Sequence, residues 1–112
     1  MTYAELLAAH CQPRKGAAHA IDAKRAQAFL GELPEWRLAD TGDVIEKEFR
    51  FENFYQTIEF VNAIAWFANR EDHHPDLVVS YNRCHVRWST HDVGGLSLND
   101  FICAAKVQAL LD

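Results

Sequence analysis

The feature that most constrains the fold of this 112-residue chain is the spacing of its apolar residues, which switches repeatedly between two periods. Helical spacing over residues 21–33 gives way to strand-like alternation over residues 36–51. The same change follows from residues 53–69 to residues 77–88, and helical spacing returns after Ser97. The chain is therefore predicted to run helix, two strands, helix, two strands, helix.

Each alternating segment contains a turn signal, which makes it a predicted β-hairpin. Residues 41–43, Thr-Gly-Asp, supply the first turn, and Asn82 with Arg83 supplies the second. Hairpins make a sheet antiparallel, and apolar helices need a surface on which to pack. We predict an α+β fold, a two-layer sandwich in which a four-stranded antiparallel sheet has three helices on one face.

Length and the N-terminal sequence set the predicted domain organisation. A chain of 112 residues lies within the size range of one domain, so residues 1–112 are predicted to form a single domain. Residues 1–19 show little periodicity, and the stretch Gln-Pro-Arg-Lys-Gly at 12–16 breaks any helix. We predict an irregular N-terminal arm over residues 1–19.

The helix predicted over residues 53–69 carries two apolar stripes on neighbouring faces. The first consists of Phe54, Ile58, Val61, Ala65 and Ala68, and the second of Phe60, Ile64 and Phe67. One sheet can cover only one of these stripes. The other is predicted to contact a second subunit in a homodimer or homotetramer, with a wider core face in a monomer as the alternative.

Composition excludes several classes of partner and points to the cytoplasm. A formal net charge of −5 without any run of Lys and Arg argues against nucleic-acid binding. No stretch of 18 apolar residues is present, so no membrane span is predicted. Cys11, Cys84 and Cys103 are odd in number and widely spaced, which is typical of reduced thiols in a cytoplasmic protein.

Histidines concentrate the chemistry of the chain. His73, His74 and Pro75 lie at the bend between the long helix and the next strand, and His91 lies at the far end of the following hairpin. Because an antiparallel hairpin folds its outer ends together, Pro75 and His91 are predicted to be spatial neighbours. Imidazole titrates near neutral pH, so such a cluster suits general acid–base catalysis.

Two alternatives to an acid–base site stay open at this point. Three histidines with nearby aspartates could bind zinc, although adjacent histidines in an extended segment point to opposite sides. Alternatively, His74 and Pro75 merely shape the start of a strand while His91 is a surface residue. Spacing alone does not separate this alternative from a functional site.

The residues around the histidines resemble the pterin-4a-carbinolamine dehydratase family in both identity and spacing. The matching residues are Asp72-His73-His74-Pro75, Tyr81-Asn82, Ser89-Thr90-His91, Gly95-Leu96-Ser97 and Asp100. The resemblance extends over nearly the whole chain from Cys11 onward. It implies the same α+β fold and an enzyme that dehydrates 4a-hydroxytetrahydropterin to quinonoid dihydropterin without metal or cofactor.

The resemblance also implies roles for individual residues. His73 and His91 would transfer protons, and His74 would bind and orient the pterin. The residues implied to line the pterin site are His73, His74, Pro75, Thr90, His91, Asp92, Val93 and Trp36. Recycling the cofactor of aromatic amino acid hydroxylases would make such a hydroxylase a partner of the protein.

Asp100 and Asn69 are the two positions where the residues themselves suggest something other than the family pattern. Asp100 belongs to the family pattern, yet with Ser97 it forms an S-x-x-D capping box, and we interpret it as a helix cap. Four residues before the first histidine the family commonly has an ionisable residue, whereas this chain has Asn69. Asparagine stabilises an imidazolium less well, so turnover is expected to be reduced unless Glu71 or Asp72 substitutes for it.

A function from a different class competes with the enzyme. Members of the family also act as dimerisation cofactors of a transcription factor or as accessory proteins, and the two-striped helix would suit such a surface. Retention of all three histidines favours the enzyme, because a scaffold has no use for them.

Overall fold

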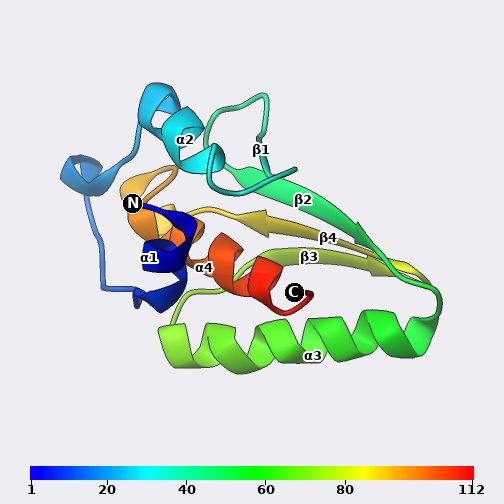
Figure 1. Ribbon diagram of the computed structural model, residues 1–112. Helices are drawn as coiled ribbons and strands as arrows, with labels where there is room; N and C mark the ends of the chain where they lie inside the picture. Colours follow the sequence, from blue (N-terminus) through cyan, green and yellow to red (C-terminus); the bar gives the residue numbers. More distant parts are fainter.

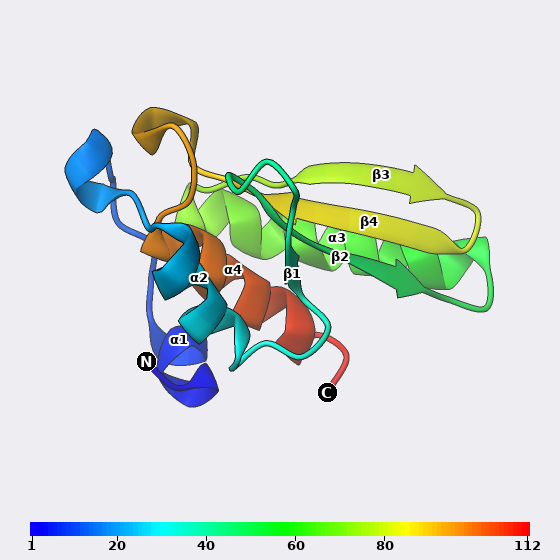
Figure 2. The same cartoon turned by 90° about the horizontal axis from the view of Figure 1, so that it is seen from above.

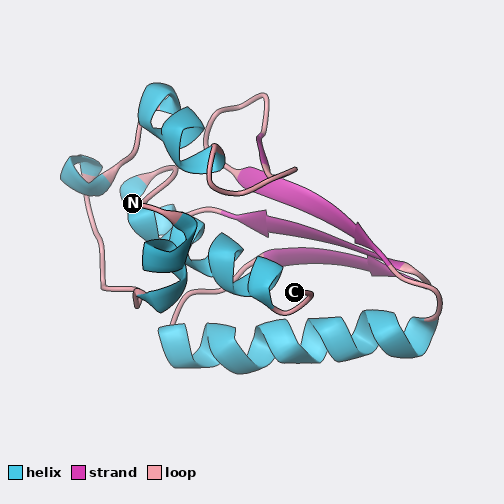
Figure 3. Ribbon diagram, viewed as in Figure 1, coloured by secondary structure: helices cyan, strands magenta, loops and turns pink.

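The computed structural model describes residues 1–112 and arranges the chain as a sheet with helices on one side (Figure 1, Figure 3). The elements in chain order are α1 (Tyr3–Ala8), η1 (Ala17–His19, a 3₁₀ turn), α2 (Ala23–Leu30), β1 (Arg37–Leu38), β2 (Ile45–Arg50), α3 (Phe54–Glu71), β3 (Asp76–Ser80), β4 (Arg83–Trp88), η2 (His91–Val93, a 3₁₀ turn) and α4 (Leu98–Ala109). None of the helices combines the length and the apolar character that crossing a bilayer requires.

The four strands form one antiparallel sheet in the order β1-β2-β4-β3. Both predicted hairpins are present, and β4 lies between β2 and β3. Ile45 pairs with Trp88 across β2 and β4, and Asp76 pairs with Arg87 across β3 and β4. The predicted α+β class, with its four-stranded antiparallel sheet, is confirmed.

Alternation along the central strands decides which face of the sheet is covered. Cys84, Val86 and Trp88 of β4 are fully buried, as is Ile45 of β2, and the residues between them face outward. Helices α3 and α4 lie across the buried face (Figure 2). Helix α2 joins the same layer through a stacked pair of rings, Phe29 and Phe101, with centroids 4.9 Å apart.

Helix α3 buries one of its two apolar stripes completely and divides the other. Phe60, Ile64 and Phe67 are buried, and the rings of Phe60 and Phe67 pack on Phe49 and Trp88 of the sheet. The other stripe is buried only at its end, at Ala68, whereas its first residue, Phe54, is 48% exposed. Asn53 begins the helix by accepting a hydrogen bond from the backbone N–H of Gln56 at 2.9 Å.

The predicted irregular arm over residues 1–19 requires a correction, because its first part forms helix α1. Thr2 and Glu5 make a reciprocal capping box, which is a local signal for the start of a helix. The signal was overlooked because no helical spacing of apolar residues follows it over a longer stretch. The fully buried side chain of Leu6 anchors this short helix in the core, where α1 contacts α4. The structure therefore has four α-helices, and the irregular part of the arm is confined to the residues that follow α1.

Candidate active site

The chain turns at the end of α3, so that the side chain of His73 points into the molecule. Asp72 adopts the left-handed conformation (φ 52°, ψ 42°), which ends the helix and reverses the chain. The backbone N–H groups of Asp72 and His73 both donate to the carbonyl of Ala68. A left-handed residue other than glycine is strained, and aspartate tolerates this conformation better than most residues.

Asp100, in the first turn of α4, is the centre of the site. Its fully buried carboxylate lies with Oδ1 2.6 Å from Nε2 of His73. Its Oδ2 accepts from Thr90 Oγ1 at 2.8 Å and from the Ser97 backbone N–H at 3.0 Å. The predicted capping box is present, but the interpretation of Asp100 as a cap alone was incomplete. The same carboxylate also contacts His73.

The ring of His73 is fixed on two sides. It stacks on the buried indole of Trp88, with centroids 5.5 Å apart and planes 11° from parallel. With Nε2 directed at a carboxylate, the neutral ring carries its hydrogen on Nε2 and presents Nδ1 as a proton acceptor. The Nδ1 atom has no partner within the protein, and the side chain is 11% exposed. The ring of His73 is therefore held in one orientation, with Nδ1 facing no protein partner.

His74 leaves the chain in a different environment from His73. It is exposed, and its Nε2 lies 3.3 Å from Oδ1 of Asn69, in the last turn of α3. Pro75, which is half-buried, follows immediately before β3. Asn69 thus occupies the position from which a carboxylate would contact His74. Glu71, considered above as a substitute, instead binds residues of the N-terminal arm.

The hairpin brings the segment of His91 to the same end of the sheet. Asp76, next to Pro75, pairs with Arg87, and β4 ends at Trp88, two residues before Thr90. Thr90 makes an isolated bridge with Gly95 that closes the loop carrying His91, Asp92 and Val93. His73 and Thr90 share the carboxylate of Asp100, so His91 is one residue from that network.

A polar cavity of about 410 Å³ opens beside His73. It is lined by residues 11–15, residues 70–73, Thr90, Asp92 and Asn99. His73, Thr90 and Asp92 of the predicted site line it, whereas His74, Pro75, His91, Val93 and Trp36 do not. No three His, Cys, Asp or Glu side chains of the chain are grouped so as to hold a metal ion.

Trp36 lies in the core, away from this cavity. Its ring packs edge-on against Phe49, and its Nε1 donates to Oε1 of Gln108 at 3.3 Å. Gln108 and Asp100 are eight residues apart on α4, which separates them by about 12 Å along the helix axis. The structure therefore does not bring Trp36 to the other predicted site residues.

Exchange of Trp36 for phenylalanine is expected to lower the stability of the protein. The variant loses one hydrogen bond and part of a buried ring, which should lower the free energy of unfolding by about 1–3 kcal/mol. Urea denaturation measures this loss. A free energy of unfolding equal to that of the unaltered protein would contradict the packing of Trp36 in the core.

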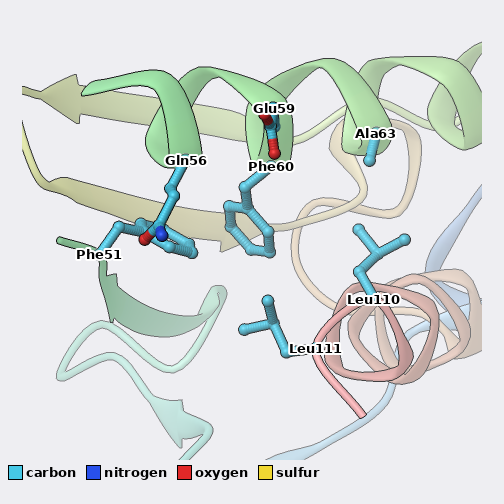
Figure 4. Close-up of a pocket in the computed structure, with 7 residues that line it drawn as sticks. All are labelled: Phe51, Gln56, Glu59, Phe60, Ala63, Leu110 and Leu111. Carbon is cyan, nitrogen blue, oxygen red and sulfur yellow. The ribbon is translucent and has the colours of Figure 1, made fainter. Parts of the chain in front are cut away.

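A second hollow, of about 330 Å³, lies between α3 and the end of α4 (Figure 4). Phe51, Phe60 and Leu110 give it an apolar lining, and Glu59 is its only titratable residue. A hollow without a histidine cannot supply the paired proton donor and acceptor that the site around His73 offers.

The sequence interpretation missed three parts of the site. Asp100 was seen only as a cap, and the arm was not expected to line the cavity. Glu71 was considered only as a substitute for the ionisable residue replaced by Asn69, and Asn99, which holds the arm together with Glu71, was not identified. Asp100 had a signal in the family pattern, but the contacts of the arm span about 60 to 90 residues of sequence and leave no local pattern.

Comparison with known proteins gives matches over most of the chain. A family model described as "Pterin 4 alpha carbinolamine dehydratase" matches residues 19–110. A protein of Xanthomonas campestris pv. campestris, named provisionally as a pterin-4-alpha-carbinolamine dehydratase, is 59% identical over 104 residues, covering 93% of this chain and 88% of that protein. A protein of Stenotrophomonas maltophilia with the same provisional name is 54% identical over 107 residues, covering 96% and 92%.

Two solved structures resemble the fold. One, described as a transcriptional coactivator/pterin dehydratase from Brucella melitensis, has a TM-score of 0.79 at 28% identity and covers 82% of this chain and 98% of that chain. The other, described as a pterin dehydratase-like RuBisCO assembly factor in the alpha-carboxysome, has a TM-score of 0.59 at 23% identity and covers 68% and 88%. The second likeness concerns the fold alone.

Proposed function

Because the chain belongs to the pterin-4a-carbinolamine dehydratase family, we propose that it removes water from a 4a-hydroxytetrahydropterin to give a quinonoid dihydropterin. As a member of that family it is a hydro-lyase. The observation that carries the proposal is the 2.6 Å contact between His73 and the buried carboxylate of Asp100, beside a polar cavity. An imidazole held in this way is suited to proton transfer.

The reaction needs one proton donor and one proton acceptor. The bond between C4a and the hydroxyl oxygen breaks, and that oxygen leaves as water after receiving a proton. The N5–H proton is removed, and its electron pair forms the new double bond between N5 and C4a. No oxidant, reductant or metal is required, because the atoms and electrons balance within the pterin and the two proton carriers.

The three histidines divide these roles in the proposal. His73 accepts or donates a proton through Nδ1 while Asp100 stabilises the positive charge that develops on its ring. His91, in the loop that follows Thr90, is the second proton carrier. Like His74 and Pro75 it does not line the polar cavity, so the pterin would extend beyond the cavity to reach it. His74, exposed beside Pro75, binds and orients the pterin. Thr90, the backbone of the following turn and Pro75 complete the proposed site.

A direct assay tests this proposal. The substrate, formed in situ, decays slowly by itself, and its ultraviolet absorbance is followed in the presence and absence of the purified protein. We expect the protein to accelerate the decay at catalytic concentration, with the same rate after treatment with a chelator. An unchanged decay rate would refute the dehydratase, and a loss of activity with the chelator would favour the zinc alternative.

Glutamate in place of Asn69 is expected to raise kcat severalfold. The carboxylate would replace the amide oxygen that now lies 3.3 Å from Nε2 of His74, and a charge-assisted hydrogen bond is about twice as strong as a neutral one. Steady-state kinetics measure the change, with Asn62→Glu, on an exposed part of α3, as the control. A kcat equal to that of the unaltered protein would show that Asn69 does not limit turnover.

We also propose a homodimer or homotetramer. Strand β3 is an edge of the sheet and exposes Val78, and Phe54 stacks on the exposed Tyr81 at its end, with ring centroids 6.4 Å apart. Trp66, on the outward side of α3, is 60% exposed. Elution as a monomer from a size-exclusion column at micromolar concentration would remove this proposal.

A second candidate function is that of an interaction protein on the same fold. The observation that favours it is the likeness to the Brucella melitensis protein described as a transcriptional coactivator. The His73→Ala variant separates the two candidates. A dehydratase loses its activity in this variant, whereas an interaction protein keeps its binding to a partner.

In the enzymatic account the protein recycles the pterin cofactor of an aromatic amino acid hydroxylase, which would be its functional partner.

A further inference from the structure

Residues 10–16 of the N-terminal arm run along one side of the cavity that contains His73. Figure 1 shows the arm passing the C-terminal end of α3 before it reaches η1. Five of the 12 residues that line the cavity, residues 11–15, belong to the arm. This wall lies outside the part of the chain that matches the family model, which begins at residue 19.

Glu71 holds the beginning of this wall. Its Oε1 accepts from the backbone N–H of Cys11 at 2.7 Å, and its Oε2 lies 2.8 Å from Nδ1 of His10. Burial acts to raise the pKa of Glu71, but these two hydrogen bonds and the charge of Lys106 outweigh it and leave the pKa below its usual value. The carboxylate, with 8% of the side chain exposed, is therefore ionised at neutral pH and bound to the arm.

Asn99 holds the middle of the wall through three hydrogen bonds. Its Nδ2 donates to the carbonyl of Gln12 at 2.7 Å, and its Oδ1 accepts from the Gln12 N–H at 3.1 Å and from Nε of Arg14 at 2.9 Å. The side chain is buried, so these bonds are shielded from water. The far end of the wall is held by the Gly16 N–H, which donates to the carbonyl of Asp92 at 3.0 Å.

Each of these anchors adjoins a residue of the proposed active site. Glu71 precedes His73 by two residues, Asn99 precedes Asp100 directly, and Asp92 follows His91. The elements that position the histidines therefore also position the arm. In Figure 2 the turns η1 and η2 lie side by side, and contacts between them agree with this view.

We propose that residues 11–15 contact the bound pterin as a wall of its site, and that Glu71 is the positioning residue that holds this wall in place. The inference rests on the proposed function. Binding of substrate should depend on the wall, whereas proton transfer should not, because Glu71 contacts no histidine of the catalytic set. Loss of the anchor should therefore raise KM and spare kcat.

Kinetics of two substitutions at Glu71 test the positioning role. Glu71→Ala removes both hydrogen bonds to the arm, and we expect KM to rise about tenfold with kcat within about twofold. Glu71→Gln keeps an oxygen for the Cys11 N–H and should recover most of the affinity. Glu59→Ala, an exposed glutamate on the same helix, serves as the matched control. An unchanged KM in Glu71→Ala, or a fall in kcat alone, would overturn the inference.

Limited digestion with trypsin gives a readout that does not depend on turnover. The wall contains two cleavage sites, Arg14 and Lys15, and α2 contains two reference sites, Lys24 and Arg25. We expect Glu71→Ala to speed cleavage in the wall alone, and 7,8-dihydrobiopterin to slow it there in the unaltered protein. Equal cleavage rates with and without this pterin, in a protein that turns over substrate, would refute the wall and leave the dehydratase standing.

Discussion

Alanine in place of His73 is expected to lower kcat by a factor of about 10²–10⁴, the range for loss of a general acid or base. The variant loses the ring whose Nε2 is held by Asp100 and whose Nδ1 is free to exchange a proton. His91→Ala is expected to fall in the same range, because the reaction needs a second proton carrier. His74→Ala should also lose activity in that range, with a rise in KM that reflects pterin binding.

His85 provides the matched control for these variants. It lies on the outward face of β4, where its Nε2 is 2.8 Å from Oε1 of Glu46. Alanine there removes a half-buried histidine without touching the proposed site, so kcat should stay within about twofold of the unaltered value. Full activity in His73→Ala and His91→Ala would refute the assignment of proton transfer.

Asparagine in place of Asp100 is expected to lower kcat by at least about 10–100-fold, the range found for groups that orient metal-bound histidines. The amide can still accept hydrogen bonds from Thr90 and the Ser97 backbone, so the helix cap is largely kept. It cannot stabilise positive charge on His73. Asp100→Ala should in addition lower the free energy of unfolding by about 2–4 kcal/mol, because buried donors lose their acceptor.

Ser97→Ala separates the two roles of the carboxylate. It removes the other half of the capping box and the 2.7 Å contact of Ser97 Oγ with Thr90 Oγ1, and it leaves the contact of Asp100 with His73 intact. We expect it to lose about 0.5–2 kcal/mol in urea denaturation and to keep kcat within about threefold. If Asp100→Asn kept full kcat, the orientation of His73 by this carboxylate would be irrelevant to catalysis.

Local patterns explain why so much of the fold could be predicted from the sequence. Cys84, Val86 and Trp88 alternate with outward residues because side chains of a strand point to opposite faces in turn. This alternation does not depend on how the strand pairs with its neighbours. The capping box at Ser97 is likewise a feature of four consecutive residues. Antiparallel pairing also predicted that the two outer ends of the second hairpin lie side by side. In the structure Asp76 pairs with Arg87 at these ends.

The parts that could not be predicted depend on contacts between distant segments. Glu71 and Cys11 are 60 residues apart, and Asn99 and Gln12 are 87 residues apart. No periodicity or turn signal encodes such a pair. The buried contact of His73 with Asp100 has the same character, since a cap and a catalytic partner look identical in sequence. Helix α1 was missed for another reason, because a helix of six residues is too short for its period to emerge.

The most direct measurement of the central claim is a crystal structure of the protein with 7,8-dihydrobiopterin. The account predicts the pterin ring in the polar cavity, with N5 or C4a next to Nδ1 of His73 and the arm at residues 11–15 against the ligand. A pterin seated in the apolar hollow between α3 and the end of α4, or bound without contact to His73, would contradict it.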